Sequence, residues 1–278
     1  RRWLDDAPAA ARWLAGEVGR GRLIAVTHGA LGVDRTATAP ADAIEALGVD
    51  DRLKLAEAET AMRRRVLDRH MLAGVTISDP ATTYIDAAAS IETDVTILPN
   101  THILGRSAIS TGAVIGPGTT LRSASIGDET SVQNSVVEDS TIGARCAVGP
   151  FSHVRGGAVI GDDCQLGNYA EVKNSRVGPG VKMHHFSYMG DADIGARANI
   201  AAGSITCNYD GEHKHRTTIG EDAFIGCDTM LIAPVTIGAR AYTATGSVVT
   251  RDVAPGETVA GVPARPFQRR SPDEESSA

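Results

Sequence analysis

The sequence predicts a mainly β fold, a parallel β-helix whose short strands wind into stacked triangular coils. The first observation behind this prediction is a run of aliphatic residues at every sixth position: Ile91, Ile97, Ile103, Ile109, Ile115 and Leu121. The second is that the residue four places after an aliphatic position is usually small. A six-residue period matches neither the 3.6 residues per turn of a helix nor the alternation of a half-buried strand. A fixed repeat of this kind defines a whole architecture.

The same period returns twice after short interruptions. It is carried by Val148, Val154, Ile160, Leu166 and Val172, and then by Ile219, Ile225, Leu231, Ile237 and Val249, with Thr243 between the last two. Glycine often follows the aliphatic residue, and we expect it at corners because it tolerates unusual backbone angles. Three strands close a coil of about 18 residues, and coils stack about 4.8 Å apart. A β-sandwich with accidental spacing is the alternative, and three runs in phase argue against it.

Residues 1–50 lack the repeat. They predict a helix over 9–18, a strand over 23–27 and a loop over 29–40, and we interpret them as a small α/β remnant of another domain. Residues 51–74 predict one long linker helix. Its apolar stripe would contain Leu55, Ala58, Met62 and Val66.

The ends of this helix carry ordinary signals. Asp50 or Asp51 can cap its start, and Gly74 can end it. We expect the β-helix over 75–265 and a disordered acidic tail over 266–278.

Composition limits the classes of function. The net charge is −7 and the pI about 5.6, which argues against a general nucleic-acid surface. No apolar run reaches the ~18 residues that span a bilayer, and no signal peptide is recognisable. The sequence begins with Arg1 and Arg2 rather than Met, so we expect it to be a fragment of something longer.

The four cysteines form no CxxC pair, so we expect no disulfide framework, no metal site and a cytoplasmic protein. Cys146 and Cys164 are 18 residues apart and both occupy the small inward position, which favours two core fillers.

Two segments interrupt the repeat, 183–194 and 205–219, and such insertions usually mark a binding face. Before the first, Arg155 and Lys173 are 18 residues apart, so two cations should lie one above the other. Like charges in that position repel each other, and an anionic ligand would relieve the repulsion. The alternative is that Glu171 or another neighbouring acid neutralises the pair.

The first interruption also contains His184, His185 and Tyr188. Histidine is the natural general base near neutral pH, which favours a catalytic site here. The alternatives are a histidine pair on the surface or a zinc site, and the histidines lack a recognisable zinc-ligand spacing.

Several segments together resemble one family of enzymes: GVDDRLKLAEAE, AGVTISDPATTYID, GPFSHVRGG, NYAEVKNS, HHFSYMGDADIG, NIAAGSITCNYDGEHKHRTTIG and DTMLIAPVTIG. The family is that of the bacterial bifunctional N-acetylglucosamine-1-phosphate uridyltransferases / glucosamine-1-phosphate N-acetyltransferases. The resemblance extends from about Leu47 to Arg251. It implies a left-handed coil, a homotrimer with sites between β-helices, and a role in UDP-N-acetylglucosamine and cell-wall synthesis.

The resemblance also implies roles for single residues. His185 matches the general base that takes the proton from the substrate amine. The residues that match the sugar-phosphate site are Arg155, Lys173, Tyr188, Asn199 and Lys214. Those that match the lining of the acetyl-CoA site are Ala202, Asn208, Tyr209, Cys227 and Thr245. The developing oxyanion needs a fixed donor, for which a backbone N–H near Ala202 and the hydroxyl of Tyr188 are both candidates.

The sequence departs from the family in three places. The nucleotide-binding loop of the uridyltransferase half is missing, and Asp50 and Asp51 stand where the family has two asparagines, one of them a magnesium ligand. Cys227 and Thr245 replace a serine and an alanine. Gly261 or Val262 falls where the family has an arginine.

The C-terminal segment VAGVPARP instead resembles generic hexapeptide acyltransferases. Arg265, Arg269 and Arg270 are therefore candidates for contacting the phosphates of CoA, with Arg265 preferred.

The leading hypothesis is acetyl transfer from acetyl-CoA to glucosamine 1-phosphate, with no metal needed; magnesium would serve only the missing uridyltransferase half. The alternatives are an acetyltransferase for another amino sugar and a non-catalytic trimeric scaffold.

Overall fold

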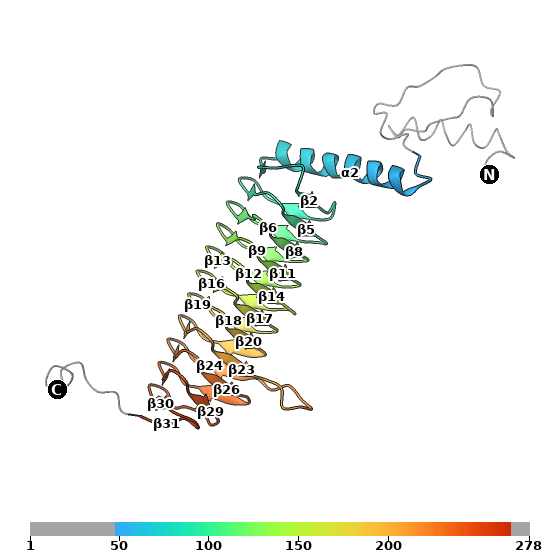
Figure 1. Cartoon of the computed structure of the whole chain (residues 1–278). Coiled ribbons are helices and arrows are strands. Elements are labelled where there is room, and N and C mark those ends of the chain that lie inside the picture. The colour runs from blue at the N-terminus through green and yellow to red at the C-terminus, as the bar shows by residue number, and fades with distance from the viewer. Residues whose placement is uncertain (1–47, 268–278) are drawn as a thin grey trace, which may run out of the picture. The chain divides into compact units, whose positions relative to one another are not determined.

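The computed structural model describes residues 48–267 (Figure 1). They form one α-helix and a mainly β, left-handed parallel β-helix, so the predicted fold class is confirmed. The helix, strand and loop predicted within 1–47, and the tail from 268 with Arg269 and Arg270, lie outside the described residues. The chain divides into two compact units, Arg1–Arg65 and Val66–Ala278.

Helix α2 (Arg52–Leu72) starts and stops at the residues that the sequence marks. The Oδ1 atom of Asp51 accepts a hydrogen bond of 2.8 Å from the backbone N–H of Lys54, as an N-cap does. At the other end, Gly74 has a φ of 95° and its N–H donates to the carbonyl of Met71. This left-handed glycine closes the helix as in a Schellman motif.

The predicted apolar stripe of α2 is buried only in part. Val66 and Leu67 belong to the core of the second unit, with 5% and 1% of their surface exposed. Leu55 and Met62 are 41% and 53% exposed. The pattern correctly predicted a helix. It did not mark a continuous buried face, because Val66 is the only residue of the stripe that belongs to the core.

The strands form three parallel sheets that we name A, B and C, the sides of the coil in chain order. Sheet A contains β1 (Thr76–Ile77), β4 (Thr96–Ile97), β7 (Val114–Ile115), β10 (Ser131–Val132), β13 (Ala147–Val148), β16 (Gln165–Asn168), β19 (Lys182–His185), β22 (Asn199–Ile200), β25 (Phe224–Ile225), β28 (Tyr242–Thr243), β30 (Thr258–Ala260) and the antiparallel β31 (Arg265–Pro266). Sheet B contains β2 (Tyr84–Ile85), β5 (His102–Leu104), β8 (Thr120–Arg122), β11 (Val136–Glu138), β14 (His153–Arg155), β17 (Glu171–Lys173), β20 (Tyr188–Gly190), β23 (Ile205–Cys207), β26 (Met230–Ile232) and β29 (Val248–Val249). Sheet C contains β3 (Ser90–Ile91), β6 (Ala108–Ile109), β9 (Ser125–Ile126), β12 (Thr141–Ile142), β15 (Val159–Ile160), β18 (Arg176–Val177), β21 (Ala192–Ile194), β24 (Thr217–Ile219) and β27 (Val235–Ile237).

Stacked coils contain slightly different numbers of residues. Arg145 and Asp163 meet across 18 residues, and Asn174 meets Asp191 across 17. The coil that contains the second interruption is longer, so that Arg197 meets Asp222 across 25 residues. The additional residues leave the stack as a loop between β23 and β24 (Figure 1). The insertion therefore lengthens one coil without changing the register of the sheets.

The repeat forms the core as predicted. The six-residue aliphatic positions point inward, and Ile97, Ile103 and Ile115 have no exposed surface. The small inward positions include hydroxyl groups that bond to backbone carbonyls, such as Ser175 Oγ to the carbonyl of Met189 at 3.1 Å. Because these buried polar groups are paired, they cost little stability. Cys146 and Cys164 are free and buried, which confirms them as core fillers.

Glycine occupies the corners from sheet C to sheet A for a different reason from the one expected. Gly127 is not among the glycines with a positive φ. A Cβ atom at Gly127 would lie 2.6 Å from the backbone carbon of Gly143 and 2.7 Å from the backbone nitrogen of Ala144. The glycine is needed because the backbones of successive coils pack tightly there.

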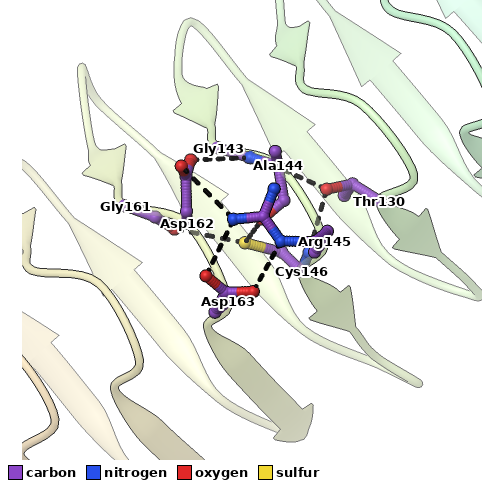
Figure 2. Close-up of polar contacts among 8 residues, drawn as sticks. All are labelled: Thr130, Gly143, Ala144, Arg145, Cys146, Gly161, Asp162 and Asp163. Atoms are coloured by element: carbon purple, nitrogen blue, oxygen red, sulfur yellow. Dashed lines mark hydrogen bonds and ion pairs between the residues drawn. The ribbon is translucent and has the colours of Figure 1, made fainter.

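Ion pairs across coils hold the outside of the same corner (Figure 2). The guanidinium of Arg145 donates to both carboxylate oxygens of Asp163, at 2.8 and 2.9 Å. Beside it, the backbone N–H of Ala144 donates to Asp162 Oδ1 at 2.9 Å. The hydrogen bond to Asp163 and its charge raise the pKa of Arg145, so each charge stabilises the other.

Candidate functional site

One corner of the coil, from sheet A to sheet B, brings together four of the predicted site residues. His185 ends β19 at this corner. In the following coils the corner is formed by Ala202, then Cys227, then Thr245: the N–H of Asp228 donates to the carbonyl of Ala202 at 2.7 Å, and that of Gly246 to the carbonyl of Cys227 at 2.8 Å. The catalytic candidate and three acetyl-CoA candidates therefore lie along one edge of the β-helix.

His185 has an exposed side chain at the first interruption of the repeat. Its backbone is fixed on both sides: it pairs with Asn168 of the preceding coil, and its carbonyl accepts a 2.6 Å hydrogen bond from Ser187 Oγ. The ring of His184 is nearby, with ring centroids 6.2 Å apart. An exposed imidazole on a fixed backbone is suited to exchanging protons with a ligand at this edge.

The predicted stack of Arg155 on Lys173 is present. The two residues are register partners in β14 and β17 of sheet B. Glu171 lies beside them, and its Oε1 accepts hydrogen bonds from Nε and Nη2 of Arg155 at 2.9 and 2.6 Å. The neutralising acid of the alternative interpretation is therefore present, and both of these hydrogen bonds pair it with Arg155.

Lys173 has a second cation beside it. Lys214, from the loop between β23 and β24, is close enough that its side chain is the main cause lowering the pKa of Lys173. Its charge, desolvation and the charge of Arg155 lower the pKa further, and Asp191 raises it slightly. A lysine with a lowered pKa is one that neighbouring positive charge disfavours, so an anion placed there would be stabilised. Arg155, Lys173 and Lys214 together are named the cation cluster below.

Tyr188 lies across sheet B next to this cluster. Gly190 is the register partner of Lys173, and a Cβ atom at Gly190 would collide with the ring and hydroxyl of Tyr188. Glycine at 190 thus allows the tyrosine to lie flat over its own strand. The phenol is half-buried and faces the same side of the β-helix as the cations.

The loop that carries Lys214 is ordered by its own contacts. Tyr209 and Lys214 form an antiparallel bridge. Oδ1 of Asp210 accepts hydrogen bonds from the backbone N–H groups of Glu212 and His213, at 2.8 and 2.7 Å, and its Oδ2 lies 2.6 Å from His215 Nε2. The bond from His213, then those from His215 and Glu212, lower the pKa of Asp210.

Both ends of the loop are attached to the sheets. At the start, Asn208 is 7% exposed and its amide nitrogen donates to Oδ2 of Asp191 at 2.5 Å. At the end, the guanidinium of Arg216 donates to both oxygens of Asp193, at 2.9 and 2.8 Å. Asn208, predicted to line the acetyl-CoA site, thus directs its amide nitrogen into the base of the loop.

Two predicted residues lie apart from this face. Asn199 is on sheet A, in register between Lys182 and Phe224. Phe224 stacks on Tyr242, with ring centroids 4.8 Å apart. Arg265 is exposed in β31, the last described strand. Asn199, a candidate for contacting the sugar, and Arg265, a candidate for contacting the phosphates of CoA, therefore lie on sheet A in different coils.

Two hollows of about 450 and 340 Å³ lie on and beside sheet C. The smaller is lined in part by Asn174, Asp193 and Arg216, which anchor the loop, and neither contains a predicted site residue. In residues 48–267 there is no cluster of three side chains suited to holding a metal ion, and no helix there is long and apolar enough to cross a membrane.

Sequence reasoning missed Asp191, Asn174 and Arg216, which position the loop. A signal was present, because Asn174, Asp191 and Asn208 recur at intervals of 17 residues. The pattern is hard to recognise in the sequence because asparagine and aspartate are common at turns for purely local reasons.

Comparison with known proteins identifies relatives of this chain. Residues 80–189 match the family described as GMPPB C-terminal domain, and residues 216–251 match the bacterial transferase hexapeptide family. The chain is 50% identical to the bifunctional protein GlmU of Halalkalibacterium halodurans over 209 residues, 75% of this chain and 46% of that protein. This part of the chain is homologous to the C-terminal part of GlmU.

Other GlmU proteins match equally well. That of Mycobacterium bovis is 50% identical over 209 residues, 75% of this chain and 42% of that protein. The chain thus spans a little under half the length of these relatives. Among solved structures, a UDP-N-acetylglucosamine acyltransferase from Campylobacter jejuni is 17% identical with a TM-score of 0.47, covering 72% of this chain and 81% of that one.

Proposed function

We propose that this chain transfers the acetyl group of acetyl-CoA to the amine of glucosamine 1-phosphate. The observation that carries the proposal is the cation cluster, in which Arg155 and Lys173 of sheet B lie beside Lys214 of the loop between β23 and β24, in a homologue of the C-terminal part of GlmU. Cations that crowd together need an anion, and a sugar phosphate supplies one.

The proposed reaction needs a base and a fixed acceptor position. A protonated amine has no lone pair for attack, so His185 would take its proton as the nitrogen attacks the thioester carbonyl. The new C–N bond forms, the C–S bond breaks, and the proton passes from the imidazolium to the departing thiolate. The cation cluster would hold the phosphate and so orient the amine. Tyr188 or a backbone N–H near Ala202 would stabilise the oxyanion.

The cosubstrate would lie along the corner from sheet A to sheet B. Ala202, Cys227 and Thr245 occupy successive coils there, at intervals of about 4.8 Å. A long flexible molecule following this edge would place its thioester near His185 and its far end toward the C-terminal coils, where Arg265 lies. We extend the proposal to a cytoplasmic homotrimer in which neighbouring β-helices complete each site. A longer parent protein that also has uridyltransferase activity is part of the same proposal.

The test is an assay of free thiol released from acetyl-CoA with a panel of acceptors: glucosamine 1-phosphate, glucosamine and glucosamine 6-phosphate. We expect glucosamine 1-phosphate to have the highest kcat/KM by a wide margin. Preference for another amino sugar would replace the proposed acceptor. No thiol release with any acceptor, together with no acetyl-CoA binding in calorimetry, would support a non-catalytic scaffold.

A further inference from the structure

A buried carboxylate lies at the centre of the interrupted coils. Asp191 is 6% exposed and sits at the corner from sheet B to sheet C, directly after β20. Its Oδ1 accepts a hydrogen bond from the amide nitrogen of Asn174, one coil before, and its Oδ2 accepts one from Asn208, one coil after, both at 2.5 Å. We name this amide–carboxylate–amide column the Asn174–Asp191–Asn208 ladder.

The ladder joins the two chain segments that carry the lysines of the cation cluster. Asn174 directly follows Lys173, and the backbone N–H of Asp191 donates to the carbonyl of Lys173 at 3.0 Å. Asn208 begins the loop that carries Lys214, and the carbonyl of Asp191 accepts a 3.1 Å hydrogen bond from Thr217, where the loop returns. A single residue therefore contacts both sides of the cluster.

Such a connection is needed because the cations repel each other. Without a link, Lys214 on its exposed loop would move away from Lys173 in the absence of an anion. A buried carboxylate is itself costly unless it is fully hydrogen-bonded, and two amide donors satisfy it here. From this geometry we propose that Asp191 is a positioning residue that sets the distance between Lys173 and Lys214 and so prepares the site for a sugar phosphate. The inference rests on the proposed function for the identity of that anion.

The ladder can be broken and then rebuilt by exchanging charges. Asn208→Asp places a carboxylate against that of Asp191, so the start of the loop should separate from sheet B. In the double variant Asp191→Asn/Asn208→Asp, the amide introduced at position 191 can accept from Asn174 and donate to the carboxylate at position 208. The control is Asp222→Asn, which removes an exposed acid paired with Arg197 at a different corner.

Two measurements on the full chain decide the matter: amide hydrogen exchange over 208–216, and the KM for glucosamine 1-phosphate. For Asn208→Asp we expect faster exchange and a KM for glucosamine 1-phosphate raised at least about tenfold, the loss that an unsatisfied buried charge implies. The double variant should recover both properties, and the control should change neither.

Several results would overturn the proposal. If exchange rises while the KM is unchanged, loop position does not govern anion binding. If the KM rises without faster exchange, Asp191 acts by charge rather than by holding the loop. A double variant no better than Asn208→Asp would also contradict it. If the wild-type chain acetylates no amino sugar, the proposed function fails on its own. The affinity of each variant for inorganic phosphate, measured by calorimetry, then replaces the KM as the test of the ladder.

Discussion

Charged side chains are arranged differently at the corner from sheet C to sheet A and at the corner from sheet B to sheet C. At the first, Arg145 faces Asp163 in solvent, and the pairing raises the pKa of the arginine. Near the second, Lys173 faces Lys214, and the crowding lowers the pKa of the lysine. The first arrangement stabilises the coil by itself. The second crowds two cations, so a ligand that supplies negative charge would stabilise it.

The aspartates at the two corners differ in the same way. Asp163 is exposed and pairs with a cation, whereas Asp191 is buried and pairs with two neutral amides. An exposed ion pair is easily replaced, because water solvates either partner. A buried carboxylate has no such alternative and fixes its neighbours. The regular coils therefore tolerate change at their polar corners, and the interrupted coils should not.

The largest expected effect is on the interrupted coils. His185→Ala should reduce kcat/KM by about 100-fold or more, because a general base typically contributes about 10² to 10⁴ in rate. The melting temperature should hardly change, since the side chain is exposed. The matched control is His184→Ala on the neighbouring ring. Equal losses for both variants in the thiol-release assay would remove the specific role from His185.

The next prediction compares Lys173, which lies beside other cations, with Arg145, which is paired with an acid. Lys173→Ala should raise the KM for glucosamine 1-phosphate about 10- to 100-fold, as expected for loss of a hydrogen bond to a charged group. Activity on glucosamine, which lacks the phosphate, should be unaffected. Arg145→Ala is the control and should leave both values unchanged. If Lys173→Ala lowers activity on the two acceptors equally, the lysine does not bind the phosphate.

A substitution in the regular coils should change stability and leave catalysis intact. Gly127→Ala would place a Cβ atom 2.6 Å from the backbone of the next coil and should destabilise the fold by about 1–3 kcal/mol, as overpacking does. In Gly48→Ala nothing lies within 4 Å of the new atom, so this variant should be neutral. Urea unfolding and kcat measure the two effects. Unchanged stability in Gly127→Ala would refute the close-packing explanation of this glycine.

The smallest expected effect is that of low pH on the order of the loop between β23 and β24. Because the pKa of Asp210 is lowered in the folded chain, its stabilisation of the loop is complete above the unfolded value of about 3.9 and is lost as the pH falls through the folded value. The amides of Glu212 and His213 should therefore stay protected from pH 7 to about pH 4. In Asp210→Asn the protection factors of these two amides, which correct for the intrinsic pH dependence of exchange, should no longer fall in acid. An unprotected loop at pH 7 would contradict this role for Asp210.

Much of the molecule follows from the sequence because the repeat imposes strict geometry. The inward aliphatic residues, the buried Cys146 and Cys164, and the stack of Arg155 on Lys173 all follow from the coil period. The close packing behind Gly127 does not, since a glycine in sequence does not show whether it serves φ or space. The exposure of Leu55 and Met62 likewise depends on where the core begins.

The ladder was out of reach for a related reason, and Lys214 was grouped with Lys173 through the family resemblance and not through the spacing. An insertion breaks the period, so the sequence no longer shows which residues lie above one another. Asp191 resembles any turn aspartate until its partners at intervals of 17 residues are known. Features fixed by the period were predictable, and features fixed by contacts across the interruption were not.

The most direct measurement of the central claim is the ionisation of Lys173 followed by NMR of its ¹³Cε atom, with and without glucosamine 1-phosphate. In the free chain its pKa should lie below the usual lysine value because of Lys214 and Arg155, and Lys214→Ala should raise it. Adding glucosamine 1-phosphate to the wild-type chain should raise the pKa of Lys173 as well, since the phosphate stabilises the charged form. A pKa of Lys173 that responds neither to the sugar phosphate nor to Lys214→Ala would contradict the assignment of the cation cluster as the phosphate site.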